Sequence, residues 1–375
     1  MKVAVITLKD SPNYGGILQA YALQKVIENL GNECVLIDYM TTEFRKKFSF
    51  LGKPESMSRV YWLYKKVQYP LMIIMMKRMM PFYNHMNLTR HYTNPVELKE
   101  LEDKYDIFVT GSDQVWACDL NYYDPSYFLD FVKEKHKVAY AASFGRTVDM
   151  LTSNEERFIK SYIEGLDYIG VREDSGVDVV KKMSKRKNAV PVLDPTFLLS
   201  EGEWEKVASH NHRGKGKKYI LCYLMQKFKN DREALKYAKR LSQKKGLPII
   251  KICRGLTSVI WGETSYIPTV EEWLGLFMDA EYIITNSFHG MAFSVNFRKQ
   301  FISFIDGDPA SGRNSRIYDR CKDFGLLDRI EIVGKKHNIV DREINYEQVS
   351  EILERLKGES YDFLKHSLKI KNEED

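Results

Sequence analysis

The residues best suited to acid–base chemistry in this chain lie together at 286–290, in the order Asn-Ser-Phe-His-Gly. They follow a run of β-branched residues and precede an apolar segment, which predicts a strand, a tight turn and a helix. The N–H groups that open a helix attract anions, and the helix dipole would keep His289 neutral until a bound phosphate favoured its imidazolium form. Gly290 would let a ligand approach the backbone closely. As an alternative, Ser287 is only a helix cap and His289 only a surface histidine.

A second polar group, Ser112-Asp113-Gln114, follows the strand predicted at 106–110. Open α/β sheets bind ligands at the carboxyl ends of their strands, so these side chains are placed where a ligand would lie. Asp113 and Gln114 are suited to binding sugar hydroxyls or to acting on one of them. A loop that only caps the strand is the alternative.

Three arginines add positive charge at similar places. Arg172 follows the strand predicted at 168–171, and Arg313 and Arg316 precede the helix predicted at 317–324. A guanidinium can hold a carboxylate or a phosphate with two parallel hydrogen bonds. The alternatives are a structural salt bridge between Arg172 and Glu173 or Asp174, and a solvated charged loop around the other two.

A glycine-containing turn, Asn13-Tyr-Gly-Gly16, follows the first predicted strand at 2–8. Its glycines do not have the GxGxxG spacing of a dinucleotide site, so it specifies no nucleotide. We interpret Asn13, Gly15 and Gly16 as the lining of a ligand cleft, with a purely structural turn as the alternative.

Strands and helices are predicted to alternate along the whole chain, which indicates an α/β protein with parallel sheets. Residues 1–199 would form a Rossmann-like domain with a basic, methionine-rich insertion at about 41–100. Residues 200–340 would form a second such domain, and residues 341–375 a C-terminal helix and a charged tail. Two domains that face each other across a cleft would gather the polar groups described above.

The composition of the chain excludes several classes of protein and of site. The chain has 375 residues, 44% of them hydrophobic, and five scattered cysteines without a CxxC pair. This pattern indicates reduced thiols in a cytoplasmic protein and excludes a cysteine-built metal site. His210 and His212 have no third ligand close in sequence, so no metal is expected. No apolar run reaches the roughly 18–20 residues of a membrane span.

The net charge of +6 is concentrated in one region. Residues 41–91 contain ten basic residues and two acidic ones, which argues against a general nucleic-acid-binding protein. The same region holds a methionine-rich segment at 69–83. It would suit an amphipathic segment lying on an anionic membrane surface, or a packed helix whose methionines fill gaps.

Seven short blocks, in order, carry a resemblance to a known family. They are Asn13-Tyr-Gly-Gly16-Ile-Leu-Gln-Ala20, Gly111-Ser-Asp-Gln-Val-Trp116, Ala142-Ser-Phe-Gly145, Val171-Arg172-Glu173, Leu193-Asp194-Pro195-Thr196, Asn286-Ser-Phe-His-Gly290 and Gly312-Arg-Asn-Ser-Arg316. Together they resemble the polysaccharide pyruvyl transferase family. The resemblance implies a two-domain GT-B-like architecture with the first domain on the acceptor side and the second on the donor side. It also implies a ketal-forming transferase of capsule or exopolysaccharide biosynthesis, which moves the pyruvyl group of phosphoenolpyruvate onto two hydroxyls of a sugar, with galactose as one candidate.

The resemblance also implies roles for the candidate residues. His289 would be the general acid or a phosphate ligand, with Ser287 and Gly290 beside it. Arg172 would grip the carboxylate or phosphate of the donor, and Arg313 and Arg316 would stabilise the departing phosphate. Asp113 would orient an acceptor hydroxyl or take its proton, while Ser112, Gln114, Asn13, Gly15 and Gly16 would line the acceptor side of the cleft. No cofactor or metal would be needed, because arginines and helix N-termini supply the positive charge.

The implied partners are phosphoenolpyruvate and a glycan acceptor, which in this family is in some cases lipid-linked. A basic, methionine-rich 41–91 region could then hold a cytoplasmic protein at the inner membrane face. Two other functions stay open from the sequence: a GT-B glycosyltransferase that uses a nucleotide sugar, and a non-catalytic glycan-binding protein.

Overall fold

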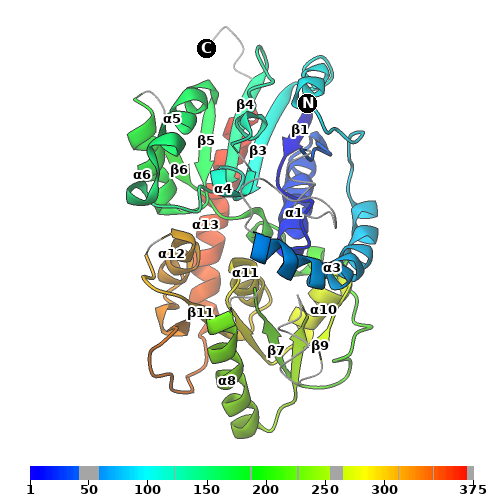
Figure 1. The fold of residues 1–375 in the computed structure, drawn as a ribbon, viewed down its shortest axis with the longest axis vertical. Helices are drawn as coiled ribbons and strands as arrows, with labels where there is room; N and C mark the ends of the chain where they lie inside the picture. The colour runs from blue at the N-terminus through cyan, green and yellow to red at the C-terminus, as the bar shows by residue number, and fades with distance from the viewer. Residues whose placement is uncertain are drawn as a thin grey trace. The chain divides into compact units, whose positions relative to one another are not determined.

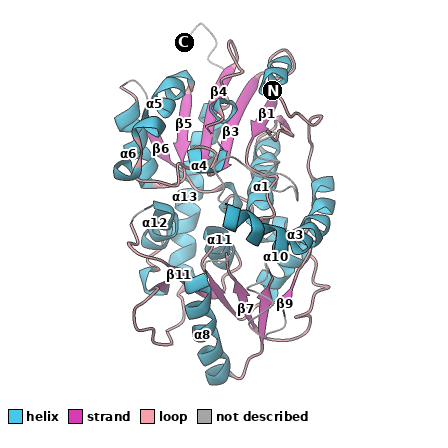
Figure 2. Cartoon of the chain, viewed as in Figure 1, coloured by secondary structure: helices cyan, strands magenta, loops and turns pink. Residues whose placement is uncertain are grey.

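The chain forms two α/β units, each built around its own parallel sheet (Figure 1). The computed structural model describes residues 1–41, 59–121, 123–185, 188–225, 228–253, 265–310, 312–340 and 342–369. Unit 1 consists of Met1–Trp62, Asn84–Leu198 and Glu354–Asp375, and unit 2 of Leu63–Tyr83 and Leu199–Leu353. The α/β class and the two Rossmann-like sheets expected from the sequence are confirmed (Figure 2).

The sheet of unit 1 has six parallel strands in the order β2-β1-β3-β4-β5-β6. Their bounds are β1 Lys2–Ile6, β2 Glu33–Leu36, β3 Ile107–Asp113, β4 His136–Ala142, β5 Tyr168–Val171 and β6 Ala189–Pro191. All seven residues of β3 are buried, as expected for a central strand with helices on both faces. The chain runs outward from β1 to β2 and then returns to start again at β3. The neighbouring strands β1 and β3 therefore form the topological switch point, where such sheets bind ligands.

Helices cover this sheet, and apolar side chains fill the space beneath them. The helices are α1 Tyr14–Asn29, α4 Cys118–Asn121, α5 Ser153–Tyr162 and α6 Asp174–Met183. In one core cluster the Trp116 ring stacks on Phe128 with centroids 5.2 Å apart. Thr152 and Glu155 begin α5 with reciprocal side-chain and backbone hydrogen bonds, so the start of that helix is set by its sequence.

The sheet of unit 2 also has six parallel strands, in the order β12-β11-β10-β7-β8-β9. Their bounds are β7 Ile220–Tyr223, β8 Ile249–Ile252, β9 Ser265–Tyr266, β10 Tyr282–Thr285, β11 Gln300–Ile305 and β12 Ile330–Ile332. The helices are α7 Glu201–Glu205, α8 Phe228–Lys245, α10 Val270–Asp279, α11 Phe288–Asn296 and α12 Ser315–Asp323. Here the switch point lies between β7 and β10, because the chain reverses its direction of travel across the sheet after β9.

Two segments are assigned differently from the sequence-based domains. The helix α3, Arg59–Met79, lies in the segment that was expected as an insertion in the first domain. From Leu63 onward it belongs to unit 2, where Arg78 forms an ion pair with Glu272 of α10 at 2.8 Å. Residues 42–58 of the expected insertion lie outside the described residues.

The C-terminal helix α13, Tyr346–Ser367, is the second such segment. It was expected as a separate part from residue 341, but its first residues belong to unit 2 and those from Glu354 to unit 1. The Tyr346 hydroxyl donates to the Ser294 carbonyl at 3.2 Å, and the Tyr361 hydroxyl donates to the Leu198 carbonyl at 3.0 Å. Among the described helices, none is both long enough and apolar enough to cross a bilayer.

Candidate functional site

In unit 1, hydrogen bonds tie the start of α1 to the switch point. The Thr7 hydroxyl donates to the Ser112 carbonyl at 3.0 Å, and the Gln19 amide donates both to Thr7 Oγ1 at 2.8 Å and to the Gly16 carbonyl at 2.9 Å. A side chain on Gly16 would place its Cβ 3.1 Å from the Leu8 carbonyl oxygen, a tight contact that the neighbouring chain would have to relieve by a small shift.

The predicted glycine turn at 13–16 is shorter than expected. Asn13 is half-buried and occupies the N-cap position of α1, whereas Gly15 and Gly16 are buried in the first turn of the helix. Gly16 is therefore a packing position within the helix, where α1 lies close to the chain that leaves β1.

Arg172 is fully buried at the carboxyl end of β5, where its guanidinium is paired with two buried carboxylates. Its Nη1 donates to Asp113 Oδ1 at 3.1 Å, and its Nη2 lies 2.6 Å from Asp194 Oδ2. The Ser112 hydroxyl accepts from Arg172 Nη2 at 2.7 Å and donates to Asp194 Oδ2 at 2.9 Å. Arg172 thus joins the end of β3 to the turn that follows β6.

These partners differ from those that the sequence offered. The predicted structural alternative for Arg172 was an ion pair with Glu173 or Asp174, but its ion-pair partners here are Asp113 and Asp194. Glu173 is also buried, and it accepts a hydrogen bond from the Ser143 hydroxyl at 2.6 Å. Gln114 is half-buried beside this network. The structure therefore brings Arg172, Ser112 and Asp113 together, as an internally paired group.

The backbone at the end of β3 is irregular. Asp113 has a φ of 68°, a left-handed conformation that is uncommon for residues other than glycine and is best tolerated by asparagine and aspartate. Gly111 has a φ of 115°, and a Cβ there would lie 2.1 Å from the Tyr140 carbonyl oxygen. The side chain of Asp113 therefore has a direction that an ordinary strand would not give it. Backbone outliers of this kind cluster at functional sites.

A cluster that the sequence analysis did not single out follows β1 and β2 at the same edge. The Lys9 ammonium is almost fully buried and lies 2.7 Å from Asp10 Oδ1 and 2.6 Å from Asp38 Oδ1. His91 Nδ1 lies 3.0 Å from the other oxygen of Asp38. The available signal was the placement of these polar residues directly after apolar strands, the same rule that selected Asp113.

Burial and charge act in opposite directions on these two carboxyl groups. Desolvation is the largest influence on Asp10 and raises its pKa against the attraction of Lys9. Desolvation also opposes ionisation of Asp38, but the charges and hydrogen bonds of Lys9 and His91 together lower its pKa. Neighbouring carboxyl groups with pKa values moved apart are a feature of acid–base sites and of structural ion pairs alike.

In unit 2, Asn286 joins the two strands of the switch point. Its Oδ1 accepts from the Met225 backbone N–H at 2.7 Å, and its Nδ2 donates to Asp231 Oδ1 at 2.9 Å. Thr285 makes a parallel connection, because its hydroxyl donates to the Tyr223 carbonyl at 2.7 Å and accepts from the Ser287 N–H at 3.1 Å. The turn before α11 is therefore fixed on the chain that leaves β7.

His289 lies in the first turn of α11 and is almost completely buried, so its interpretation as a surface histidine is wrong. Its ring packs perpendicular to that of Phe288, with centroids 5.2 Å apart. Ser287 occupies the N-cap position, but within the described residues its side chain makes no capping hydrogen bond. The structure thus places an imidazole and a hydroxyl together at the amino end of a nine-residue helix.

The structure explains the glycine at position 290 by packing, and not by the predicted approach of a ligand to the backbone. A Cβ at this position would lie 2.1 Å from Thr285 Oγ1. The absence of a side chain therefore lets α11 pack directly against β10. A Cβ at this position would point into the protein interior and not toward a ligand.

The two predicted arginines at the start of α12 have different environments: Arg316 lies in the first turn of the helix and Arg313 just before it. Arg316 is half-buried, and its guanidinium carbon lies 5.9 Å from the centre of the Phe288 ring, which brings it close to the start of α11. Arg313 is exposed in a short 3₁₀ turn, Gly312–Asn314. Asn314 fixes this turn by donating to the carbonyl oxygens of Asp306 and Asp308 at 2.5 and 3.1 Å.

His210 and His212 do have an acidic neighbour, although none is close in sequence. Asp279 lies 3.0 Å from His210 Nδ1 and 2.9 Å from His212 Nε2, and these ligand-type atoms lie within 4.8 Å of one another. The Gly214 N–H donates to His212 Nδ1 at 3.1 Å, so a neutral His212 carries its proton on Nε2 and donates it to Asp279. A metal at Nε2 would need the opposite tautomer, which makes a hydrogen-bonded cluster the better description of this group.

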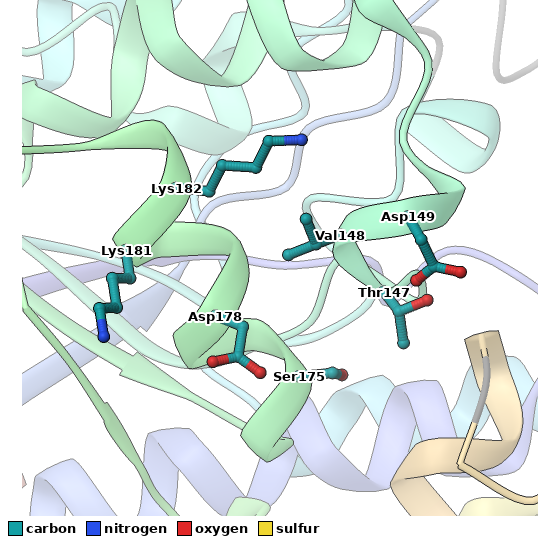
Figure 3. A pocket seen from close by; sticks show the side chains of 7 residues that line it. All are labelled: Thr147, Val148, Asp149, Ser175, Asp178, Lys181 and Lys182. Carbon is teal, nitrogen blue, oxygen red and sulfur yellow. The ribbon is translucent and has the colours of Figure 1, made fainter.

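A surface hollow of about 500 Å³ lies in unit 1, between the start of α6 and the chain that follows β4. Figure 3 shows that α6 forms one wall and the segment at 147–149 the other. It is lined by Thr147, Val148, Asp149, Ser175, Asp178, Lys181 and Lys182. None of the site residues predicted from the sequence is among them.

Solved structures share the fold of this chain. S. aureus MnaA, in a structure with UDP, has a TM-score of 0.50 and 12% sequence identity over 98% of this chain and 91% of its own. A candidate UDP-N-acetylglucosamine 2-epimerase from Listeria monocytogenes has a TM-score of 0.50 and 9% identity over 97% of this chain and 90% of its own. At such low identity the likeness shows the fold alone, which is the GT-B type with two Rossmann-like domains.

Sequence comparison gives a more specific result. No curated protein matches the chain. The profile of the polysaccharide pyruvyl transferase family does match it, over residues 13–309, a range that includes the ends of β3, β5 and β10 and the start of α11. With that match, and with both switch points carrying the residues that suggested the resemblance, the chain belongs to the polysaccharide pyruvyl transferase family.

Proposed function

We propose that this transferase moves the pyruvyl group of phosphoenolpyruvate onto two hydroxyls of one sugar in a polysaccharide precursor. Membership of the family supports pyruvyl transfer onto a polysaccharide. The proposed donor is a small molecule that carries a carboxylate and a phosphate, and the proposed product is a cyclic ketal with release of phosphate. Galactose is one candidate for the sugar.

The observation that carries the donor assignment is the amino end of α11. There His289 is buried beside Ser287 on the switch point of unit 2, and Arg316 lies near the adjoining Phe288. Helix N–H groups, an imidazole and a guanidinium form a suitable environment for a phosphate ester. The positive charge comes from the chain itself, so we propose a reaction without a metal or cofactor.

The reaction balances with one acid and one base. A proton added to the methylene carbon of the donor leaves an oxocarbenium-like centre at the neighbouring carbon. One sugar hydroxyl attacks that carbon and loses its proton, the bond to the phosphate oxygen breaks, and the second hydroxyl closes the ring. Its proton leaves with the phosphate. His289 is the proposed acid or phosphate ligand, and Arg316 with the exposed Arg313 would stabilise the departing phosphate.

The pairing of Arg172 suggests a refinement of its role. To grip the donor it would have to exchange Asp113 or Asp194 for the donor's anion, although both are held within 3.1 Å. We therefore assign Arg172 to positioning Asp113, whose carboxylate would orient an acceptor hydroxyl or take its proton. Ser112 and Gln114 would support the acceptor, and Asn13, Gly15 and Gly16 would shape the neighbouring wall.

The acceptor we propose is a lipid-linked precursor of a capsule or exopolysaccharide. The protein would then act in the cytoplasm, in peripheral contact with the inner face of the membrane.

The test is phosphate release from phosphoenolpyruvate with galactosides, glucosides and N-acetylhexosaminides as acceptors, with mass spectrometry of the acceptor. His289→Gln and His289→Ala should lose acceptor-dependent release by about 10²-fold or more, the usual contribution of a general acid. His85→Ala, which removes an exposed histidine, is the matched control. Stabilisation by a nucleoside diphosphate without turnover of phosphoenolpyruvate would instead indicate a glycosyltransferase, and glycan binding without turnover a binding protein.

A further inference from the structure

One face of α3 is an exposed apolar stripe. Leu63, Val67, Pro70, Ile74 and Lys77 are all exposed, and they recur at intervals of four, three, four and three residues. At 100° per residue this spacing places them along a single line on the helix. Leu63, Val67 and Ile74 expose 57%, 66% and 49% of their surface, which is unusual for three large apolar side chains on one face.

The opposite face of the same helix is firmly packed in unit 2. Met75 and Met79, which lie well round the helix from the stripe, are buried. Arg78 flanks the stripe, where it pairs with Glu272 of α10 at 2.8 Å and lies over the Tyr266 ring of β9. Figure 1 shows α3 alongside α10. The helix is therefore already packed in unit 2, and it still leaves the stripe exposed.

The charge of α3 indicates what covers the stripe. The helix contains five basic residues and no acidic one in its sequence RVYWLYKKVQYPLMIIMMKRM. Lys77 ends the stripe and is exposed, and Lys66 lies beside it half-buried. Met80, the residue that follows the helix, is 60% exposed. An apolar line edged by cations is complementary to lipid tails and anionic headgroups.

We propose that the stripe Leu63–Val67–Pro70–Ile74–Lys77 rests in the interface of an anionic membrane. The helix would lie parallel to the surface, with its apolar side chains below the headgroups and Lys66 and Lys77 among the phosphates. A second copy of the chain is less suited to this face, because two identical stripes would oppose cations without any acid on the helix to pair with them. The proposal rests on the proposed function, since it supplies the surface on which a lipid-linked acceptor is presented.

Vesicle co-sedimentation of the full chain tests the proposal, without donor or acceptor. Wild type should bind vesicles of phosphatidylglycerol mixed with phosphatidylcholine and not vesicles of phosphatidylcholine alone. Lys77→Gln should weaken binding about five-fold, the effect of one cation near an anionic surface. Val67→Glu and Ile74→Glu should weaken it further, because each places a carboxylate against the headgroups. Val96→Glu, at an exposed apolar residue in unit 1, is the matched control and should bind as wild type does.

Turnover of a water-soluble acceptor separates this proposal from the proposed function. The α3 variants should retain it while they lose vesicle binding. Wild type that binds neither vesicle type, or Val67→Glu that binds as tightly as wild type, would overturn the membrane assignment even if pyruvyl transfer is observed. Loss of self-association in Val67→Glu, measured by sedimentation velocity, would overturn it in favour of a second copy.

Discussion

At the scale of single residues, each buried cation at the strand ends of unit 1 is paired with carboxyl groups of the same unit. Arg172 faces Asp113 and Asp194, and Lys9 faces Asp10 and Asp38. A buried ion pair contributes little net stability compared with apolar residues, but removing one member leaves the other without compensation. Such pairs therefore fix geometry at the edge where a ligand would bind.

Asp194→Ala should lower the free energy of unfolding by about 3–5 kcal/mol, because it removes one of the two carboxylates that face a fully buried guanidinium. Glu359→Ala is the matched control, since it breaks an exposed pair with Arg355 and should cost less than about 0.5 kcal/mol. Urea unfolding followed by circular dichroism measures both. Equal effects of the two substitutions would show that the Arg172 network is not buried in solution.

The cluster around His210 predicts a pH dependence. Hydrogen bonds that His210 donates to Asp279 and then to Glu205 raise its pKa above the usual value, although partial burial opposes this. A group with a raised folded-state pKa contributes stability that is complete below about pH 6.5, the unfolded value, and is lost as pH rises through the folded value. His210→Gln should therefore reduce the fall in unfolding free energy above about pH 6.5. If the unfolding free energy of His210→Gln falls with pH as steeply as that of wild type, the inferred interaction of His210 with Asp279 and Glu205 is wrong.

At the scale of secondary-structure elements, the contact between α11 and β10 depends on a glycine. A Cβ on Gly290 would lie 2.1 Å from Thr285 Oγ1, whereas a Cβ on Gly202 of α7 meets nothing within 4 Å. The same substitution thus has opposite consequences on two helices of one unit.

Gly290→Ala should destabilise the protein by about 1–3 kcal/mol through overpacking. Gly202→Ala should be neutral or stabilising by up to about 1 kcal/mol, because alanine favours the helix. Thermal unfolding of both variants and wild type measures the difference. Because Gly290 adjoins His289, Gly290→Ala should also reduce turnover, and retention of full activity would argue that the start of α11 does not bind the donor.

At the scale of the whole molecule, each unit has one switch point that carries polar residues. Unit 2 presents the helix start with His289, and unit 1 presents Asp113 paired with Arg172. This division predicts that donor and acceptor bind to different sheets.

Hydrogen–deuterium exchange tests that division. Phosphoenolpyruvate at a concentration of about 100 times its Kd should slow amide exchange in α11 by about 100-fold. This applies to amides that exchange only through a local opening that releases the ligand. The acceptor glycan should instead protect the end of β3, and α5 should exchange alike in all conditions. Protection of β3 by phosphoenolpyruvate alone would assign the donor to unit 1.

Much of the fold could be predicted because its signals are local. Runs of β-branched and apolar residues at 2–8, 168–171 and 282–284 agree with β1, β5 and β10, since a buried parallel strand needs little beyond its own apolar composition. The short strand β12 and the helix α6 were not predicted. β12 has only three residues and hence a brief signal, whereas Val179, Val180 and Met183 give α6 an apolar face at helical spacing that the prediction overlooked.

The sequence by itself determined the alternation of strands and helices and the placement of polar residues directly after strands. Only the tertiary structure decided which of those residues are paired and which side of a helix is covered. Arg172 and Asp113 are 59 positions apart, and Ser112 and Asp194 are 82 apart, so no local pattern could pair them. The exposure of the stripe on α3 depends likewise on the burial of Met75 and Met79 on the far side of the helix. The physical reason is that periodicity along a chain fixes a backbone conformation, whereas burial, ion pairing and exposure depend on what the folded chain brings alongside.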